Sequence, residues 1–204
     1  MKITAVTMLA VFTGAAAQAG KPGQPAERTV TVCMESDAIG AAVAVPAKET
    51  ASKMFAGIGV TLDWRHNCPA QGILISLSEH DQAERRLPQA FGYALPYEGT
   101  HIVIFYDRLQ RSADPALIPS LLAHVMVHEI THILEGIARH SSQGVMKAAW
   151  DGSDYSAMPL TPLPFAPEDI DLIYHGLAER AAQVASPAPA GNTKDRSASK
   201  AIVQ

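Results

Sequence analysis

The sequence is short of basic residues, of cysteine and of long apolar runs, and each shortage excludes a class of protein. Sixteen Lys and Arg residues against 20 Asp and Glu residues leave a formal net charge of −4. Proteins that bind nucleic acid need clustered basic side chains to neutralise phosphates, so we expect no nucleic-acid partner. The two cysteines, Cys33 and Cys68, lack the spacing of metal ligands. The apolar stretch at residues 3–17 is shorter than the roughly 20 residues that a membrane-spanning helix needs.

The first residues have the features of a secretory signal peptide, which we place at 1–19. Lys2 precedes the apolar stretch, and Ala-Gln-Ala at 17–19 supplies the small residues after which signal peptidase cuts. We therefore expect an exported protein, secreted or periplasmic, that is not attached to a membrane after cleavage. An uncleaved anchor is the alternative. In an oxidising compartment Cys33 and Cys68 are expected to form a disulfide, with two buried thiols as the alternative.

The last residues, 181–204, are rich in Ala, Ser and Pro and show no hydrophobic periodicity. Such a segment cannot bury enough apolar surface to offset the entropy of ordering it, so we expect a disordered tail. Residues 28–178 remain as one domain, which is large enough to form its own core. We expect this domain to be a monomer.

Short runs of β-branched or alternating residues predict the strands. They lie at 29–33, 60–64, 73–77 and 101–106. The Gly- and Pro-bearing stretch at 88–99 is expected to form a loop or a ragged edge strand.

Two helices are predicted between and after these strands. The first covers residues 38–55 and is expected to be interrupted, or to begin afresh, near Pro46. In the second, apolar residues recur at helical spacing from Leu121 to Leu134, so the helix is nearly buried; Pro119 suits its first turn and Gly136 its end. The order of elements indicates an α+β fold, in which a mixed twisted sheet is packed against helices.

The buried helix carries His128, Glu129 and His132. Residues four apart on an α-helix differ by about 40° around its axis, so both imidazoles can bind one metal ion. Glu129 lies about 100° from His128, where it can reach a water on the metal and take its proton. The pattern predicts a Zn2+ site with Glu129 as the catalytic base, and the alternative is a pair of histidines buried in the core.

The residues that follow resemble those of a known family. The two helical histidines are followed by Gly136, His140 and Met146. This order of residues resembles the motif of the metzincin zinc peptidases, most of all that of the matrixin-like catalytic domain. The resemblance implies a zincin-like fold, His140 as the third zinc ligand and Met146 in a tight turn beneath the metal. This chain has three residues on each side of Gly136 where the family has two. The span from His128 to Met146 nevertheless equals that of matrixins.

Residues 165–176 resemble the last helix of matrixins, which begins with acidic residues and ends in Tyr-Gly. Ile170, Ile173 and Tyr174 lie on one helical stripe, as a packed helix requires. The resemblance therefore implies an active-site helix and a C-terminal helix. It also implies an upper lobe in which an edge strand pairs with an extended substrate, and either 101–106 or the loop before it could supply that edge.

Several residues compete with these assignments. The carboxylates that could replace His140 as third ligand are Glu135, Asp151, Asp154 and Glu168. His124 lies one turn before His128, so we expect it to support the ligands or simply to be buried. Tyr155 and Tyr174 could stabilise an oxyanion, although packing with one hydrogen bond is the expected role.

The function predicted from these residues is that of a secreted zinc-dependent endopeptidase acting on a protein or peptide substrate. Two alternatives stay open: a catalytically inactive, zinc-stabilised binding protein of the same fold, and an exported protein without metal. The short stretch between residue 19 and the first strand leaves no room for a long inhibitory propeptide, so we expect an enzyme that is active without proteolytic maturation or is restrained by a separate partner.

Overall fold

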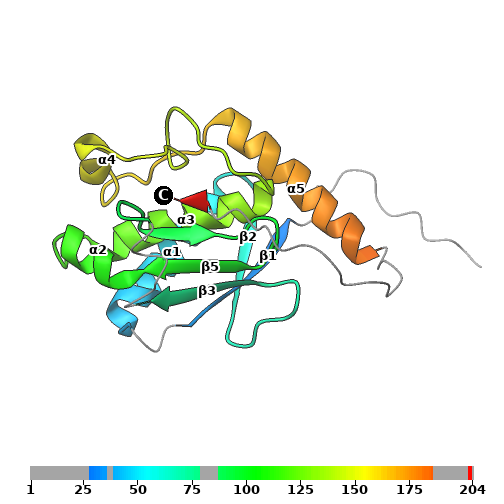
Figure 1. Cartoon of the computed structure of the whole chain (residues 1–204), viewed down its shortest axis with the longest axis horizontal. Helices are drawn as coiled ribbons and strands as arrows, with labels where there is room; N and C mark the ends of the chain where they lie inside the picture. The colour runs from blue at the N-terminus through cyan, green and yellow to red at the C-terminus, as the bar shows by residue number, and fades with distance from the viewer. Residues whose placement is uncertain (1–27, 36–38, 79–86, 186–201, 204) are drawn as a thin grey trace, which may run out of the picture.

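The computed structural model describes residues 28–35, 39–78, 87–185 and 202–203, which form one mixed sheet and the helices packed on it (Figure 1). The predicted signal peptide lies outside these residues. In chain order the elements are β1 (Thr29–Met34), α1 (Ala41–Ala56), β2 (Thr61–Arg65), β3 (Ile73–Ser78), β4 (Gly92–Ala94), β5 (His101–Phe105), α2 (Tyr106–Ser112), α3 (Ile118–Glu135), α4 (Gly152–Ala157), α5 (Pro167–Ala185) and β6 (Ile202–Val203).

The sheet has the strand order β2-β1-β3-β5-β4-β6. The four strands β2, β1, β3 and β5 are parallel, whereas β4 runs antiparallel to β5 and β6 antiparallel to β4. Parallel neighbours need a crossover, and α1 supplies the one between β1 and β2. The stretch at 88–99 thus contains the antiparallel strand next to β5. It is one of the two segments that were candidates for the edge strand.

Helices α1 and α3 pack against each other and against the sheet. The predicted break in the first helix is wrong, because α1 runs without interruption from Ala41 to Ala56 with Pro46 inside it. Pro46 lies in the second turn, where only the hydrogen bond to residue 42 is lost. Ala47, Ala51 and Phe55 are fully buried on the core side of the helix, and this burial stabilises the helix by more than the lost hydrogen bond costs.

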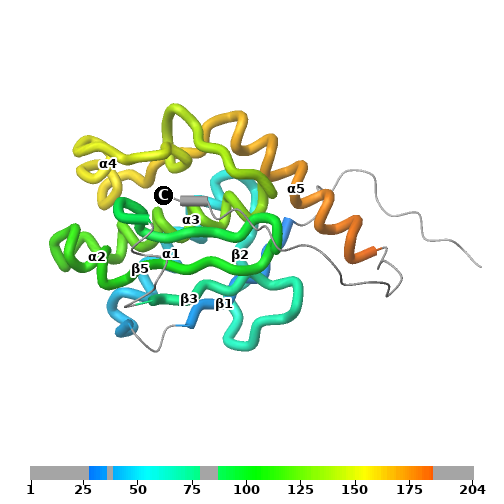
Figure 2. Tube along the Cα trace, in the orientation of Figure 1, coloured from blue at the N-terminus to red at the C-terminus, as the bar shows by residue number. Residues whose placement is uncertain are grey.

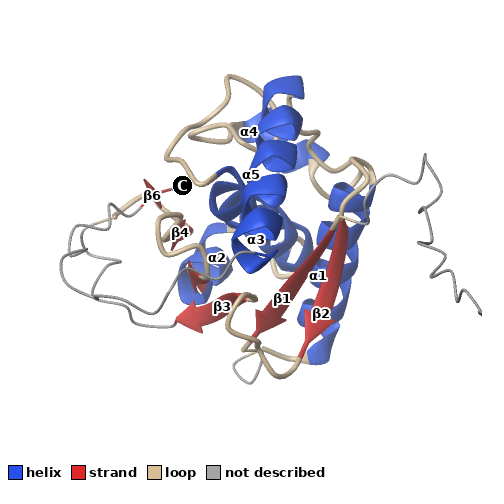
Figure 3. Ribbon diagram, turned by 90° about the vertical axis from the view of Figure 1, so that its right-hand side faces the viewer, coloured by secondary structure: helices blue, strands red, loops and turns tan. Residues whose placement is uncertain are grey.

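Helix α3 lies between the sheet and the segment that follows it, as both views of the ribbon show (Figures 1 and 3). The chain leaves α3 and runs past α4 to α5 on the side of α3 away from the sheet (Figure 2). Helices α2 and α4, of 7 and 6 residues, were not expected from the sequence. These helices are too short for a helical pattern of apolar residues to be recognised in the sequence, which explains the omission.

Helix α5 crosses α3 at Gly176. A Cβ added to Gly176 would lie 1.7 Å from the Leu134 carbonyl oxygen, so only glycine allows the two helices to approach this closely. The helix continues to Ala185 and therefore includes residues 181–185, which the sequence had placed in the tail. Residues 186–201 and 204 lie outside the described residues, and 202–203 form β6. Among the described residues no helix is long and apolar enough to cross a membrane.

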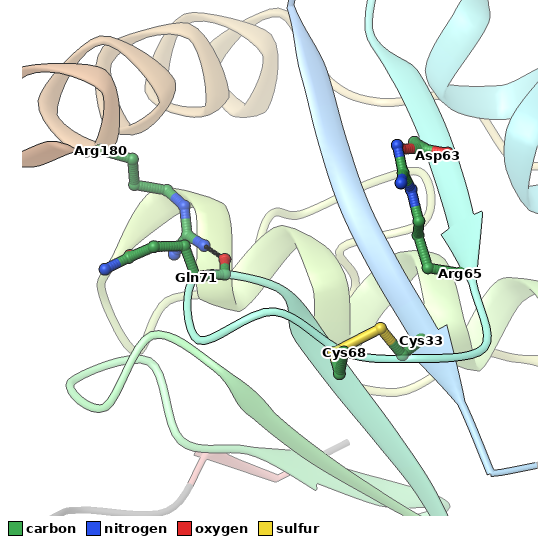
Figure 4. The surroundings of a disulfide bond; sticks show 6 residues. All are labelled: Cys33, Asp63, Arg65, Cys68, Gln71 and Arg180. Carbon is green, nitrogen blue, oxygen red and sulfur yellow. Dashed lines mark hydrogen bonds and ion pairs between the residues drawn. A yellow bond between two sulfur atoms is a disulfide. The ribbon is translucent and has the colours of Figure 1, made fainter.

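A disulfide joins Cys33 on β1 to Cys68 in the loop after β2, as expected, with a Cα–Cα distance of 5.6 Å (Figure 4). The same loop is attached to α5, because the Arg180 guanidinium donates to the Gln71 carbonyl oxygen at 2.9 Å. The loop between β2 and β3 therefore connects the sheet to the last helix.

Candidate metal centre

Helix α3 is buried along almost its whole length. It has proline in its first turn and ends at Gly136, which has the left-handed φ of 68° and donates its N–H to the His132 carbonyl oxygen. The polar side chains of His124, His128, Glu129, Thr131 and His132 are all fully buried. Polar groups in such a position require partners, because burial without a hydrogen bond or a metal costs about 1–3 kcal/mol each.

His128 and His132 point at each other from successive turns of α3. Their Nε2 atoms are 3.0 Å apart and their ring centroids 4.6 Å apart. The Nδ1 of His128 is 2.8 Å from the Val145 carbonyl oxygen, which can only accept, so Nδ1 carries the proton and Nε2 offers a lone pair. Tetrahedral zinc with N–Zn bonds of about 2.0–2.1 Å separates two ligand nitrogens by about 3.3 Å, close to the separation of these two.

His140 completes the group from the loop after α3. Its ring lies 5.2 Å from that of His128 and 5.0 Å from that of His132. One nitrogen of each of the three rings lies within 4.8 Å of those of the other two. The structure therefore brings together the three predicted histidines. It does so although the segment between His132 and His140 is longer than in the metzincin motif that the sequence resembles.

A tight turn at residues 144–147 fixes the far end of this loop. The Lys147 N–H donates to the Gly144 carbonyl oxygen at 3.3 Å, and the Ser141 N–H to the Met146 carbonyl oxygen at 2.7 Å. Gly144 has a φ of +74°, and an added Cβ would lie 2.2 Å from the Pro164 carbonyl oxygen. Met146 is fully buried in this turn. Its predicted place beneath a metal stays a prediction.

An ionic cluster fixes the near end of the loop, directly beside His140. The Arg139 guanidinium donates to Asp169 Oδ1 at 2.7 Å and to Ser141 Oγ at 3.0 Å, and the Ser141 hydroxyl donates to the same carboxylate. Asp169 is fully buried near the start of α5, where its Oδ2 also accepts the Ala166 N–H at 3.0 Å. Both residues that flank His140 are therefore attached to α5.

Burial keeps the helical histidines neutral. Desolvation, together with the nearby His132 ring, lowers the pKa of His128 well below 6.5, against the opposing hydrogen bond to Val145. Desolvation, His140 and Arg139 lower the pKa of His132 to about 3, while a backbone hydrogen bond at Ile137 raises it. Neutral imidazoles are the form that binds metals, since the charged ring has no lone pair.

Glu129 shows why the group fits a metal. Its side chain is fully buried, and neither carboxylate oxygen has a hydrogen-bond partner among the residues that the structure describes. Burial raises its pKa well above 4.5. Zn2+ takes nitrogen ligands and leaves a position for water that a carboxylate can bind, so three convergent imidazoles and a buried acid next in sequence to His128 are the residue types that it requires.

The carboxylates that competed with His140 are occupied elsewhere. Glu135 and Glu168 lie 3.4 and 3.8 Å from the Arg139 guanidinium. Asp151 and Asp154 form the reciprocal cap at the start of α4, and both also bind Lys147. None of these four carboxylates belongs to the one group that could hold a metal among the described residues.

The remaining candidates make contacts of their own. His124 is bonded at both ring nitrogens, to the Ser120 carbonyl oxygen at 2.7 Å and to the Leu163 N–H at 3.0 Å. Tyr174 donates to the Ile58 carbonyl oxygen, and its ring stacks on Arg28. Tyr155 packs its ring 6.4 Å from that of Trp150.

Sequence reasoning missed the groups that orient the histidines. The Val145 carbonyl holds His128 and also accepts the Trp150 indole N–H at 3.3 Å. A backbone carbonyl has no sequence signature. Arg139 and Asp169 do have one, because they are charged residues inside the resembling segments, but only the fold shows that they meet across 30 residues.

The fold recurs in a known protein. The crystal structure of archaemetzincin from Methanopyrus kandleri, determined at 1.5 Å resolution, superposes with a TM-score of 0.51 and 17% sequence identity, covering 76% of this chain and 98% of that chain. No family model and no curated protein matches the sequence. The predicted α+β, zincin-like fold is thus confirmed. The fold is metzincin-like and its three histidines can hold a metal, whereas the closer matrixin resemblance stays a prediction.

Proposed function

We propose that the chain is a zinc-dependent endopeptidase in which His128, His132 and His140 hold the metal and Glu129 is the catalytic base. One observation carries this proposal: three imidazoles converge within a metzincin-like fold, and the residue after His128 is a buried carboxylate without a hydrogen-bond partner among the described residues. A core histidine such as His124 pairs its ring nitrogens with backbone groups, whereas the Nε2 atoms of His128 and His132 face each other at 3.0 Å.

Each residue has a separate part in the reaction. When bound, zinc would supply a Lewis acid that polarises the scissile carbonyl and makes a water more acidic. The Glu129 carboxylate accepts a proton from the attacking water as the C–O bond forms. It then returns the proton to the amide nitrogen as the C–N bond breaks. Burial raises the pKa of Glu129 above 4.5, which strengthens the carboxylate as a proton acceptor.

Export and substrate form the second part of the proposal. The disulfide between Cys33 and Cys68 suits an oxidising compartment, which supports the signal peptide expected at residues 1–19 and a secreted or periplasmic location. The antiparallel strand β4 suits an extended protein or peptide substrate, which would add to the sheet through backbone hydrogen bonds.

Metal analysis and cleavage together test the function. The purified chain should contain one zinc per molecule and cleave an unfolded protein substrate, and a chelator should remove both properties. Glu129→Gln should keep the metal and lose at least about 100-fold in kcat, the lower end of what a general base contributes. Zinc without cleavage in the unaltered chain would indicate an inactive binding protein, and absence of stoichiometric zinc would refute the metal site.

A further inference from the structure

The described end of the chain returns to the sheet. Strand β6 pairs antiparallel with β4, with Val203 opposite Tyr93 and Ile202 opposite Ala94. Without β6, β4 would be the edge strand. Figures 1 and 3 both show β6 beside β4, at the side of the sheet where α3 lies.

The direction of the backbone groups on β4 follows from its pairing with β5. The Leu95 N–H donates to the His101 carbonyl oxygen, and the Phe91 carbonyl oxygen accepts the Phe105 N–H. Backbone groups alternate along a strand, so residues 91, 93 and 95 face β5 and Ala94 faces the other way. Ala94 therefore directs its N–H and carbonyl toward β6, and Ile202 is the residue that exchanges hydrogen bonds with it.

This edge belongs to a strand that packs against the helix of the candidate metal centre. Strand β4 packs against α3, the helix that carries His128 and His132, and Ala94 is fully buried there. A strand added to β4 consequently runs along the helix that holds the two histidines. An extended substrate that reached the metal by strand addition would occupy the same edge.

The geometry of α5 explains how the chain can return. Arg180 donates to the Gly99 carbonyl oxygen at 2.8 Å, in the turn that follows β4, and to the Gln71 carbonyl oxygen at 2.9 Å. The last helix therefore passes beside the turn between β4 and β5 at Arg180. A segment tethered near its binding site has a high effective concentration, so a short pairing is sufficient to keep it bound part of the time.

We propose that residues 202–203 occupy the edge of β4 that a peptide substrate would use, so that this end of the chain competes with substrate from within the molecule. The proposal rests on the proposed peptidase function. It assigns an internal occupant to the substrate edge and predicts a partly inhibited enzyme. One or two backbone hydrogen bonds shift such an equilibrium by about fivefold to tenfold.

Two proline variants of the full chain test the pairing with the same chemistry at neighbouring positions. Ile202→Pro removes an N–H that faces Ala94, whereas Val203→Pro removes one that faces away from β4 and that an outer strand can lose. Amide hydrogen exchange at Ala94 should accelerate about fivefold to tenfold in I202P and remain unchanged in V203P. The Tyr93 amide, which faces β5, should exchange equally in all three proteins.

Kinetics then test competition. I202P should lower KM for an extended peptide about fivefold at unchanged kcat, and a synthetic peptide of residues 196–204 added to I202P should raise KM again. Equal Ala94 exchange in I202P and V203P would overturn the pairing. Altered exchange with an unchanged KM would overturn the competition. Exchange requires neither metal nor turnover, so an inactive protein with the expected exchange pattern would refute the peptidase function and leave the pairing intact.

Discussion

The two halves of the candidate metal centre are built in opposite ways. His128 and His132 lie a turn apart on α3, so their convergence follows from the helix alone. His140 lies in a loop whose path depends on α5 and on the turn at residues 144–147. Changes to the helical half should therefore abolish the site directly, whereas changes to distant residues should damage only the loop half.

The largest effect is expected when a ligand is removed from the helical half. His132→Ala should lower zinc affinity by more than about 100-fold, since losing a group that merely supports a ligand costs about 10- to 100-fold. His140→Ala should also remove most of the affinity. The measurement is zinc titration against a competing chelator. His124→Ala is the matched control on the same helix, and a loss of zinc in H124A equal to that in H132A would contradict the assignment.

The next effect concerns the turn that ends the loop half. Gly144→Ala should reduce the free energy of unfolding by about 3 kcal/mol, because it combines a left-handed φ with a clash against backbone. Gly136→Ala is the control, since Gly136 has a similar φ but open space around its Cβ position. It should cost only about 1 kcal/mol. If urea unfolding gave the same loss of free energy of unfolding for both variants, the close contact between Gly144 and the Pro164 carbonyl oxygen would be refuted.

A smaller effect should follow from breaking the ionic cluster. Asp169→Asn removes the charge that binds Arg139 beside His140 and should weaken zinc binding about 10- to 100-fold. In the cobalt-substituted protein, the visible spectrum should report an altered coordination sphere if His140 moves. Glu168→Gln removes a half-exposed partner of the same arginine and should change affinity less than about threefold. An unchanged cobalt spectrum in D169N would mean that the cluster does not position the ligand.

The smallest effect, counted per pH unit, is a pH dependence at the junction of the two halves. Burial raises the pKa of Glu135 from 4.5 to about 8, and Arg139 opposes this shift. The folded state therefore binds the proton more tightly than the unfolded state, so stability falls as pH rises from 4.5 towards 8. Glu135→Gln should be progressively more stable than the unaltered chain over this interval, by at most about 1.4 kcal/mol per pH unit. Parallel stability curves of the metal-free proteins would refute the raised pKa.

Much of the fold could be predicted because periodicity records burial. The strands near residues 29, 60, 73 and 101 and the buried helix ending at Gly136 were predicted close to their observed bounds. The break at Pro46 was wrong because buried alanines and Phe55 hold α1 together across the lost hydrogen bond. The extension of α5 to Ala185 was missed because its last turns are largely exposed, which leaves little hydrophobic signal.

The sequence by itself determined the pair of histidines and their neighbouring carboxylate, because the pitch of an α-helix converts a spacing of four residues into a common face. It also indicated that His140 was available nearby. Only the tertiary structure decided that His140 turns toward the pair, that Val145 orients His128, and that β6 lies on the edge of β4. These contacts join residues far apart in the chain through backbone groups and buried charges, and no local spacing encodes such a meeting.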